Sequence, residues 1–353
     1  MHLLAPYTTF RLGGPAARLV TARTDDEVVA AVREADARGE PVLLIGGGSN
    51  LVIADEGFDG TAVRIATRGV TLDGTALELA AGEPWSDAVA ATVRAGLAGV
   101  ECLAGIPGSA GATPIQNVGA YGQEVSSTIT DVLAYDRRTG RTVTLPAEAC
   151  AFSYRGSRFK EDPARYVVLR VRFALEDAGG LSAPLKYPET ARALGVEAGE
   201  RVPLEKASAT VLGLRASKGM VLDAADHDTW SAGSFFTNPV LTAAEFAAFL
   251  DRVHDRLGPD TAPPAYPASE GPGSGSGERT KTSAAWLIDK AGFTKGYGTG
   301  PARISGKHTL ALTNRGGATT EDLLALAREV RDGVREAFGV TLVNEPVMVG
   351  VEL

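Results

Sequence analysis

The sequence is poor in the residues that build disulfide frameworks and metal centres. Among 353 residues there are two cysteines, four histidines and three methionines. Cys102 and Cys150 each lie in an apolar neighbourhood without a CxxC or Cys/His spacing, which predicts two buried, reduced thiols. The histidines do not follow any metal-ligand spacing, so we expect no metal site.

Long apolar runs are also missing. No segment approaches the roughly 20 apolar residues that span a membrane, and the first residues lack the charged and apolar regions of a signal peptide. Lys plus Arg number 35 against 43 Asp plus Glu, a net charge of −8, which disfavours a sequence-independent nucleic-acid binder. A local basic cluster could still bind an anionic small molecule. We therefore predict a cytoplasmic protein that binds neither nucleic acid nor a membrane.

The length exceeds what one hydrophobic core usually serves, which predicts two domains. Up to about residue 175 the chain has several runs rich in β-branched and aromatic residues, at 129–135, 141–145 and 166–175. Their succession, with few helices between them, indicates an α+β fold rather than regular βαβ alternation. We expect one domain over residues 1–200 and a second over 201–353, whose last strand packs back on the first domain.

The second half has clear helix signals. Thr242–Glu245 is a capping box for a helix that runs to Leu257, and a long amphipathic helix is predicted over Thr320–Phe338. Val340–Leu342 and Val347–Val349 are predicted strands. Residues 258–281, rich in Pro, Gly and Ser, are predicted to form an exposed mobile loop with a disordered Gly/Ser tract.

The most unusual stretch is Gly105–Gly122, which has five glycines, two prolines and almost no charge. It cannot be an ordinary helix or central strand, because Gly costs backbone entropy and Pro removes a hydrogen-bond donor. Its apolar residues, such as Ile106 and Val118, are unlike a flexible linker. Two interpretations remain open: a tight structural loop, or a backbone held close against a flat or phosphorylated ligand.

A second glycine cluster, Gly46–Asn50, lies between the apolar segments 41–45 and 51–53. Backbone N–H groups exposed there could cradle a phosphate. The cluster lacks the Lys-Ser/Thr of a P-loop and the GxGxxG entry to a helix, which argues against an ATPase and against a nicotinamide-binding Rossmann domain.

Three residues stand out as candidates for chemistry. Arg155 lies in a segment of packed strand and turn, where its guanidinium needs either an internal acid or an anionic ligand. Ser234 lies between a glycine and two phenylalanines without a nucleophile-elbow motif, so it is either a held hydroxyl or a plain turn serine. Glu345 interrupts a C-terminal apolar strand, where it is either desolvated with a raised pKa or directed to solvent at a strand edge.

Taken in order, these motifs resemble those of the UDP-N-acetylenolpyruvoylglucosamine reductase (UDP-N-acetylmuramate dehydrogenase) family. The resemblance runs from Thr8 almost to the C-terminus. It is carried by six segments: Gly46-Gly47-Gly48-Ser49-Asn50, Ile106-Pro107-Gly108, Pro114–Gly122, Tyr154-Arg155, Gly233–Pro239 and Ala285–Asp289.

The resemblance implies an FAD-binding domain of the vanillyl-alcohol-oxidase type followed by an α+β substrate-binding domain. It also implies a flavoenzyme of peptidoglycan precursor synthesis that reduces UDP-N-acetylglucosamine enolpyruvate to UDP-N-acetylmuramate with NADPH. Separately, we expect the protein to be a monomer. Arg155, Ser234 and Glu345 match the positions of the family's catalytic residues. The flavin is expected to be non-covalent, since the segment Thr8–Leu175 contains no histidine and its cysteines lie outside the glycine loops.

The same match assigns the remaining site residues. The cofactor positions are Gly46, Gly47, Gly48, Ser49, Asn50, Ile106, Pro107, Gly108, Ser109, Gly111, Thr113, Asn117, Gly119 and Ala120. The substrate positions are Tyr121, Tyr187, Lys218, Asn238 and Tyr266.

The chain departs from the family pattern in two places. Asn344 precedes Glu345 where the family usually has a proline, and the insertion at 259–277, which contains Tyr266, is longer than expected. Two alternative functions are kept: a related FAD-dependent sugar or alcohol oxidase, and a non-catalytic protein that binds a nucleotide sugar on the same scaffold.

Overall fold

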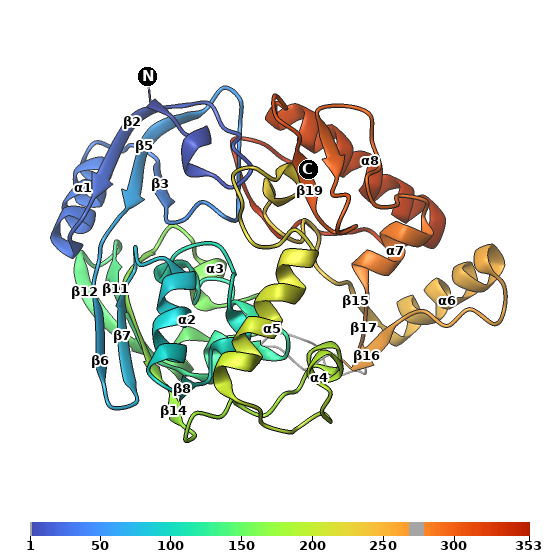
Figure 1. Ribbon diagram of the computed structural model, residues 1–353. Helices are drawn as coiled ribbons and strands as arrows, with labels where there is room; N and C mark the ends of the chain where they lie inside the picture. Colours follow the sequence, from blue (N-terminus) through green and yellow to red (C-terminus); the bar gives the residue numbers. More distant parts are fainter. Residues whose placement is uncertain (1, 268–278) are drawn as a thin grey trace. The chain divides into compact units, whose positions relative to one another are not determined.

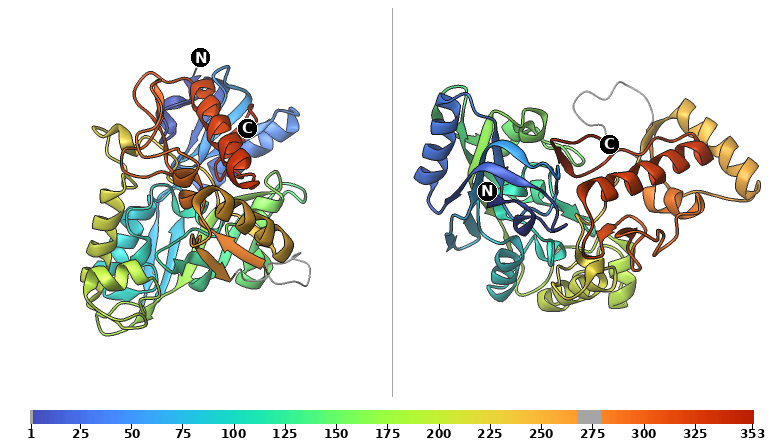
Figure 2. Two further views of the ribbon diagram at one scale, coloured as in Figure 1. Left: turned by 90° about the vertical axis from the view of Figure 1, so that its right-hand side faces the viewer. Right: turned by 90° about the horizontal axis from the view of Figure 1, so that it is seen from above.

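The structure is a computed structural model that describes residues 2–267 and 279–353 (Figures 1 and 2). The chain divides into two compact units. Unit 1 comprises Met1–His2, Ala16–Gly48 and Asp59–Val221, and unit 2 comprises Leu3–Pro15, Ser49–Phe58 and Leu222–Leu353. Residue 200, the expected domain boundary, therefore lies within unit 1, and two N-terminal segments belong to the unit that holds the C-terminal residues.

Unit 1 is built on a five-stranded sheet with the order β12-β11-β13-β7-β6, in which all neighbours are antiparallel (Figure 1). The strands are β6 (Val70–Asp73), β7 (Ala76–Ala80), β11 (Ile129–Asp136), β12 (Arg141–Pro146) and β13 (Tyr166–Ala174). This confirms the three strands expected between residues 129 and 175.

The central strand β13 is apolar along most of its length because both of its faces are buried. On one face, Val171 and Phe173 pack with the helix α2 (Trp85–Arg94), where the rings of Trp85 and Phe173 lie 5.8 Å apart. On the other face, Val167 and Leu169 pack against α1 (Asp25–Ala37).

A four-stranded sheet, with the order β1-β2-β5-β3, precedes the main sheet in the chain. Its strands are β1 (His2–Leu3), β2 (Pro15–Ala22), β3 (Val42–Ile45) and β5 (Phe58–Ile65), and β3 pairs with β5 in parallel. Between β2 and β3, α1 is capped by Thr24, whose hydroxyl accepts the N–H of Glu27.

The rest of unit 1 consists of short elements and two helices. They are β8 (Leu97–Ala98), η2 (Glu101–Leu103), η3 (Ala110–Ala112), β9 (Gly119–Ala120), β10 (Gln123–Glu124), η4 (Val125–Ser127), η5 (Ala147–Cys150), α3 (Arg158–Glu161), β14 (Glu176–Asp177), α4 (Pro188–Leu194) and α5 (Leu204–Ser217).

Unit 2 is organised around α8 (Thr320–Phe338), the long red helix in both views of Figure 2. Its buried stripe, which includes Leu323, Ala327, Val330 and Val334, packs into the main core of the unit. The other elements are η1 (Ala5–Tyr7), β4 (Leu51–Ile53), η6 (His227–Thr229), β15 (Val240–Thr242), α6 (Ala243–Leu257), β16 (Ala265–Pro267), β17 (Arg279–Thr282), α7 (Ala284–Lys290), β18 (Ala302–Ile304), β19 (Leu312–Asn314) and β20 (Val347–Val349).

The expected helices of unit 2 and its last strand are confirmed. Thr242 forms the full capping box of α6, and α8 has the predicted bounds. The last strand, β20, pairs in parallel with β4. No helix in the described ranges is long and apolar enough to cross a membrane.

Two local predictions are wrong. Val340–Leu342 is not a strand: Val340 and Leu342 are buried in the core of unit 2, and burial alone explains their apolar character. Residues 258–281 are not simply a loop, because β16 and β17 form an antiparallel sheet with β15 in the order β15-β17-β16. The Gly/Ser tract between them, at 268–278, lies outside the described residues.

A buried carboxylate ties together two distant segments of unit 1. Glu101 is fully buried, and its two oxygens accept the backbone N–H groups of Gly99 at 2.7 Å and Ala183 at 2.6 Å. Nearby, β14 pairs with β8. Glu101 therefore anchors the segment that leads from β14 to α4.

We expect Glu101→Ala to lower the free energy of unfolding by about 2–4 kcal/mol, because it leaves two partly buried N–H groups without an acceptor. Urea unfolding measures this change. Glu197→Ala, which removes an exposed carboxylate from the same unit, should change the free energy by less than about 0.5 kcal/mol. Equal effects of the two substitutions would contradict the anchoring role.

Candidate functional site

The two glycine-rich segments of unit 1 meet backbone to backbone. A Cβ placed on Gly47 would lie 2.5 Å from the Cα of Gly108, and one on Gly46 would collide with the hydroxyl of Ser109. Gly48 has φ +61°, a conformation that side chains disfavour. Glycine is therefore required here by close approach. Gly46–Gly48 belong to unit 1, whereas Ser49 and Asn50 belong to unit 2.

The loop that opposes Gly47 is fixed along its length. The N–H of Ala110 donates to the carbonyl of Glu83 at 2.8 Å, and that of Gly111 donates to Ala81 at 2.9 Å. A Cβ on Gly111 would collide with the side chain of Ala81. Further along, the Ser157 hydroxyl donates to the carbonyl of Ile115 at 2.5 Å. The stretch Gly105–Gly122 is therefore fixed in place within unit 1, unlike a mobile linker. We call it the glycine wall. It carries all the predicted cofactor positions after Asn50: Ile106, Pro107, Gly108, Ser109, Gly111, Thr113, Asn117, Gly119 and Ala120.

Within this wall the Asn117 side chain has a structural task. Its Nδ2 donates to Glu124 at 3.0 Å and to the carbonyl of Ser153 at 3.1 Å, while its Oδ1 accepts the N–H of Ser126 at 3.1 Å. The side chain is 1% exposed. The Asn117 side chain therefore fastens the loop to the neighbouring segments by hydrogen bonds.

Three non-glycine residues with left-handed backbones occur together. Asn117, Tyr121 and Arg155 have φ values of 46°, 49° and 54°. The guanidinium of Arg155 donates to the carbonyl of Gly119 at 2.8 Å, which brings it to the loop. Each such conformation costs free energy, of order 1 kcal/mol, and persists where the surrounding structure imposes it, often at functional sites.

Three of the five predicted substrate positions also come together in unit 1. The rings of Tyr121 and Tyr187 lie 5.5 Å apart in a T-shaped arrangement. The Nζ of Lys218 lies 5.5 Å from the centre of the Tyr121 ring, within cation–π range. Tyr187 is 43% exposed, so the cluster is open to a ligand.

Arg215 is a candidate that the sequence reasoning missed. It lies on the buried face of α5, in register with Leu204, Ala207 and Val211, and is 8% exposed. Its Nη2 donates to the carbonyl of Met220 at 2.9 Å, but its buried Nε has no hydrogen-bond partner. Burial lowers the pKa of Arg215 to about 10, so it stays charged at neutral pH. An arginine in the apolar stripe of a helix was the signal available in the sequence.

This buried cation lies beside the glycine wall. A Cβ on Gly105 would lie 3.7 Å from the Arg215 Nε. An uncompensated guanidinium with a free donor is complementary to an anionic group. The unpartnered donor of Arg215 beside the glycine wall fits the anionic diphosphate of a dinucleotide such as FAD.

In unit 2, backbone pairing brings Ser234 and Glu345 to adjacent segments. The N–H of Glu345 donates to the carbonyl of Phe235 at 2.8 Å, and Phe236 forms an isolated antiparallel β-bridge with Asn344. Phe235 and Phe236 are buried, so the residues on either side of them are held in place. Glu345 therefore lies beside the residue that follows Ser234.

Asn50 joins the same group in unit 2. Its Nδ2 donates to the carbonyl of Glu345 at 3.3 Å, and its own carbonyl accepts the N–H of Val347 at 2.9 Å. The segment Gly46–Asn50 thus ends against the residues just before β20, which include Glu345. Arg155, by contrast, belongs to unit 1.

The two remaining substrate positions lie elsewhere in unit 2. The Oδ1 of Asn238 accepts the N–H of Ala284 at 3.0 Å at the start of α7, which gives that side chain a structural role. Tyr266 lies in β16, pairs with Lys281 and is 54% exposed.

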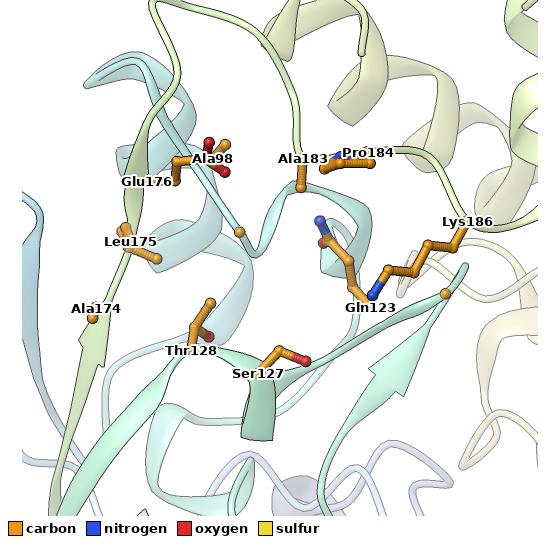
Figure 3. A pocket seen from close by; sticks show the side chains of 12 residues that line it. Ala98, Gln123, Ser127, Thr128, Ala174, Leu175, Glu176, Ala183, Pro184 and Lys186 are labelled. Carbon is orange, nitrogen blue, oxygen red and sulfur yellow. The ribbon is translucent and has the colours of Figure 1, made fainter. Parts of the chain in front are cut away.

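Unit 1 also has a cavity of about 250 Å³, whose lining includes Gly122 and Lys186, the chain neighbours of Tyr121 and Tyr187 (Figure 3). It is bounded on one side by Ala183, Pro184 and Lys186, and the Lys186 side chain extends toward Gln123. Its volume is below the range of roughly 300–1,000 Å³ that is usual for small-molecule sites. None of the predicted site residues lines it, so we do not assign the cofactor to it.

The cysteines are unsuited to chemistry. Both are free and buried, as predicted. Burial raises the pKa of Cys102 to about 12 and that of Cys150 to about 11. Their thiols therefore stay protonated and weakly nucleophilic at neutral pH. No group of three or more potential metal ligands occurs in the described ranges.

Comparison with known proteins identifies both parts of the chain. Residues 16–145 match the family model described as FAD binding domain, and residues 224–349 match that of UDP-N-acetylenolpyruvoylglucosamine reductase, C-terminal domain. The second match contains Ser234, Asn238 and Glu345. The first ends before Arg155.

Relatives and a solved structure agree with these matches. The chain is 78% identical over 350 residues to the UDP-N-acetylenolpyruvoylglucosamine reductase of Streptomyces avermitilis, covering 99% of this chain and 94% of the relative. The enzyme of the same name from Thermobifida fusca is 58% identical, over 99% of this chain and 97% of the relative. The crystal structure of the Thermus caldophilus reductase superposes with a TM-score of 0.66 at 26% identity and covers 98% of this chain and 97% of that one.

We expect Gly47→Ala to weaken FAD binding at least tenfold or to prevent folding, because the new Cβ would force the two glycine segments apart. FAD titration followed by flavin fluorescence measures the affinity. Gly213→Ala is the matched control: Gly213 lies in α5 with nothing near its Cβ position, so alanine should stabilise the protein by up to about 1 kcal/mol. Unchanged FAD affinity in Gly47→Ala would contradict the close-approach argument.

We expect Arg215→Met to raise the free energy of unfolding of ligand-free protein by about 1–3 kcal/mol, because it removes a desolvated charge. The gain should shrink as pH rises through 10, where Arg215 loses its proton in the folded state but not yet in the unfolded state. The same variant should be stabilised less by added FAD or by the nucleotide-sugar substrate. Urea unfolding with and without ligand measures both effects, with Lys206→Met, exposed on the same helix, as the control.

Proposed function

Since the chain belongs to the UDP-N-acetylenolpyruvoylglucosamine reductase family, it is an FAD-dependent oxidoreductase, and we propose that Arg155, Ser234 and Glu345 carry out its chemistry. Its reaction is the reduction of UDP-N-acetylglucosamine enolpyruvate to UDP-N-acetylmuramate in peptidoglycan precursor synthesis. The observation that carries the proposal is the joint placement of Ser234, Glu345 and Asn50 by backbone pairing in unit 2. When bound, FAD supplies to the alkene the hydride that NADPH provides.

Arg155 has the charge that the substrate needs. Addition of hydride to the terminal alkene carbon leaves negative charge on the adjacent carbon, which spreads into its carboxylate. A guanidinium held by the carbonyl of Gly119 and by its own left-handed backbone can stabilise that charge without reorganising.

Ser234 is the proposed proton donor. Its hydroxyl is a weak acid in water, but the enolate formed by hydride addition is basic enough to take its proton. The buried rings of Phe235 and Phe236 hold the adjacent backbone and reduce access of water. Glu345 is proposed to align this donor, because its N–H is bonded to the carbonyl of Phe235.

The remaining roles are proposed on the same basis. The glycine wall and Gly46–Gly48 hold FAD without a covalent bond. This is supported by the burial of both cysteines, which lie outside the two glycine-rich segments. Tyr121, Tyr187 and Lys218 bind the diphosphate part of the substrate. We further propose that the protein acts as a monomer in the cytoplasm.

The decisive experiment separates the two half-reactions. Purified protein should bind FAD with a yellow spectrum, lose the absorbance on anaerobic addition of NADPH, and regain it on addition of the enolpyruvyl sugar. Reoxidation by oxygen with an alcohol as reductant would favour an oxidase. An inert flavin would favour a non-catalytic binding protein.

Ser234→Ala should leave flavin reduction by NADPH within about twofold and slow reoxidation by the sugar by about 10²–10⁴-fold, because only the second half-reaction needs the proton. Stopped-flow absorbance measures each half-reaction. Ser86→Ala, which removes an exposed hydroxyl from α2, is the control and should retain the second half-reaction. Loss of both half-reactions in folded Ser234→Ala protein would refute the assigned role.

A further inference from the structure

The lysine of the proposed diphosphate site is already held by an acid. The Nζ of Lys218 donates to both carboxylate oxygens of Glu189, at 2.8 and 2.7 Å. Glu189 lies in the first turn of α4, two residues after Tyr187, and Lys218 directly follows the last residue of α5. The Glu189 carboxylate therefore already binds Lys218, one of the residues that are proposed to bind the diphosphate of the substrate.

The chemistry of this contact resembles that of a bound phosphate. An ammonium group has three donors and no acceptor, and two of its hydrogen bonds are taken by carboxylate oxygens here. Burial is the largest influence on the pKa of Lys218 and lowers it, but the hydrogen bond to Glu189 and nearby charges raise the pKa overall above its usual value. Phosphate oxygens would compete for the same donors.

We propose that Glu189 is a built-in competitor of the ligand's diphosphate for Lys218, and that it sets how strongly the site binds nucleotides. This inference rests on the proposed function. In the ligand-free protein, Glu189 keeps Lys218 ordered next to the Tyr121 ring. A diphosphate that binds Lys218 takes donors that the Glu189 carboxylate otherwise occupies, so part of the ion pair is lost on binding. Glu189 thus weakens binding of every anion.

The exposure of the Lys218 and Glu189 side chains sets the expected size of the effect on nucleotide affinity. The side chains of Lys218 and Glu189 are 29% and 37% exposed, so the pair is partly screened by solvent. Pairs of this kind contribute about 0.2–1 kcal/mol, which corresponds to a change in dissociation constant of roughly 1.4- to 5-fold. Salt screens the pair, so the effect should be larger at low ionic strength.

The competing interpretation is that Glu189 only supports the fold. An acid in the first turn of a helix stabilises it through the helix dipole, and the ion pair links α4 to α5. If that were its whole role, Glu189→Gln would loosen Tyr187 and Lys218, and nucleotide binding would weaken. The two interpretations predict opposite signs.

The test is calorimetric titration of uridine diphosphate into the FAD-loaded protein at 50 mM and 500 mM salt. Glu189→Gln should bind uridine diphosphate about two- to fivefold more tightly than the parent protein at low salt, with a smaller gain at high salt. Lys218→Met should bind it more weakly. Glu189→Gln added to Lys218→Met should not tighten binding of uridine diphosphate, because the lysine for which Glu189 competes is then absent.

Glu197→Gln removes an exposed charge from the segment that follows α4 and should leave the affinity unchanged. Unchanged or weaker binding by Glu189→Gln, a gain that persists without Lys218, or no binding of uridine diphosphate to any variant would overturn the proposal. Tighter binding in a protein that does not reduce the enolpyruvyl sugar would support the competitor and reject only the proposed function.

Discussion

The structure of unit 1 depends on the contact between Gly47 and Gly108. Two backbones can approach this closely only where neither carries a Cβ, so the glycines are required by contact between segments and not by turn formation alone. Once the contact is made, the hydrogen bonds of Ala110 and Gly111 to the chain before α2 hold the loop rigid. A backbone that is already rigid can receive a cofactor with little further loss of conformational entropy on binding.

Around the glycine wall, several residues adopt arrangements that lower the stability of the fold. Arg215 is buried with an unpartnered Nε, and three left-handed residues, Asn117, Tyr121 and Arg155, lie in the same neighbourhood. Each feature lowers the stability of the fold, and Arg215 leaves a buried donor that an anionic ligand could use. At Lys218 the corresponding loss of stability is smaller, because the Glu189 carboxylate forms an ion pair with the lysine. The site therefore balances ligand affinity against the stability of the free protein.

Much of the fold could be predicted from local patterns. The capping box at Thr242, the apolar stripe of α8 and the β-branched run of β13 depend on spacing and propensity within one element. The same patterns failed at Val340–Leu342, where apolar residues are buried without a strand partner. The candidate site was predicted only through the ordered motifs. Arg215, Glu101 and Glu189 were missed, since their roles depend on partners 5 to about 80 residues away in the chain.

By itself, the sequence determined the glycine-rich segments, the family and the identities of Arg155, Ser234 and Glu345 as candidates, because motifs of fixed spacing carry that information. Only the tertiary structure decided that Asn117 staples its loop, that Glu345 pairs beside Ser234, and that Glu189 holds Lys218. It also decided that the segments 3–15 and 49–58 belong to unit 2. The physical reason is the same in each case. Hydrogen bonds and ion pairs between separate segments do not produce a periodic pattern in the sequence.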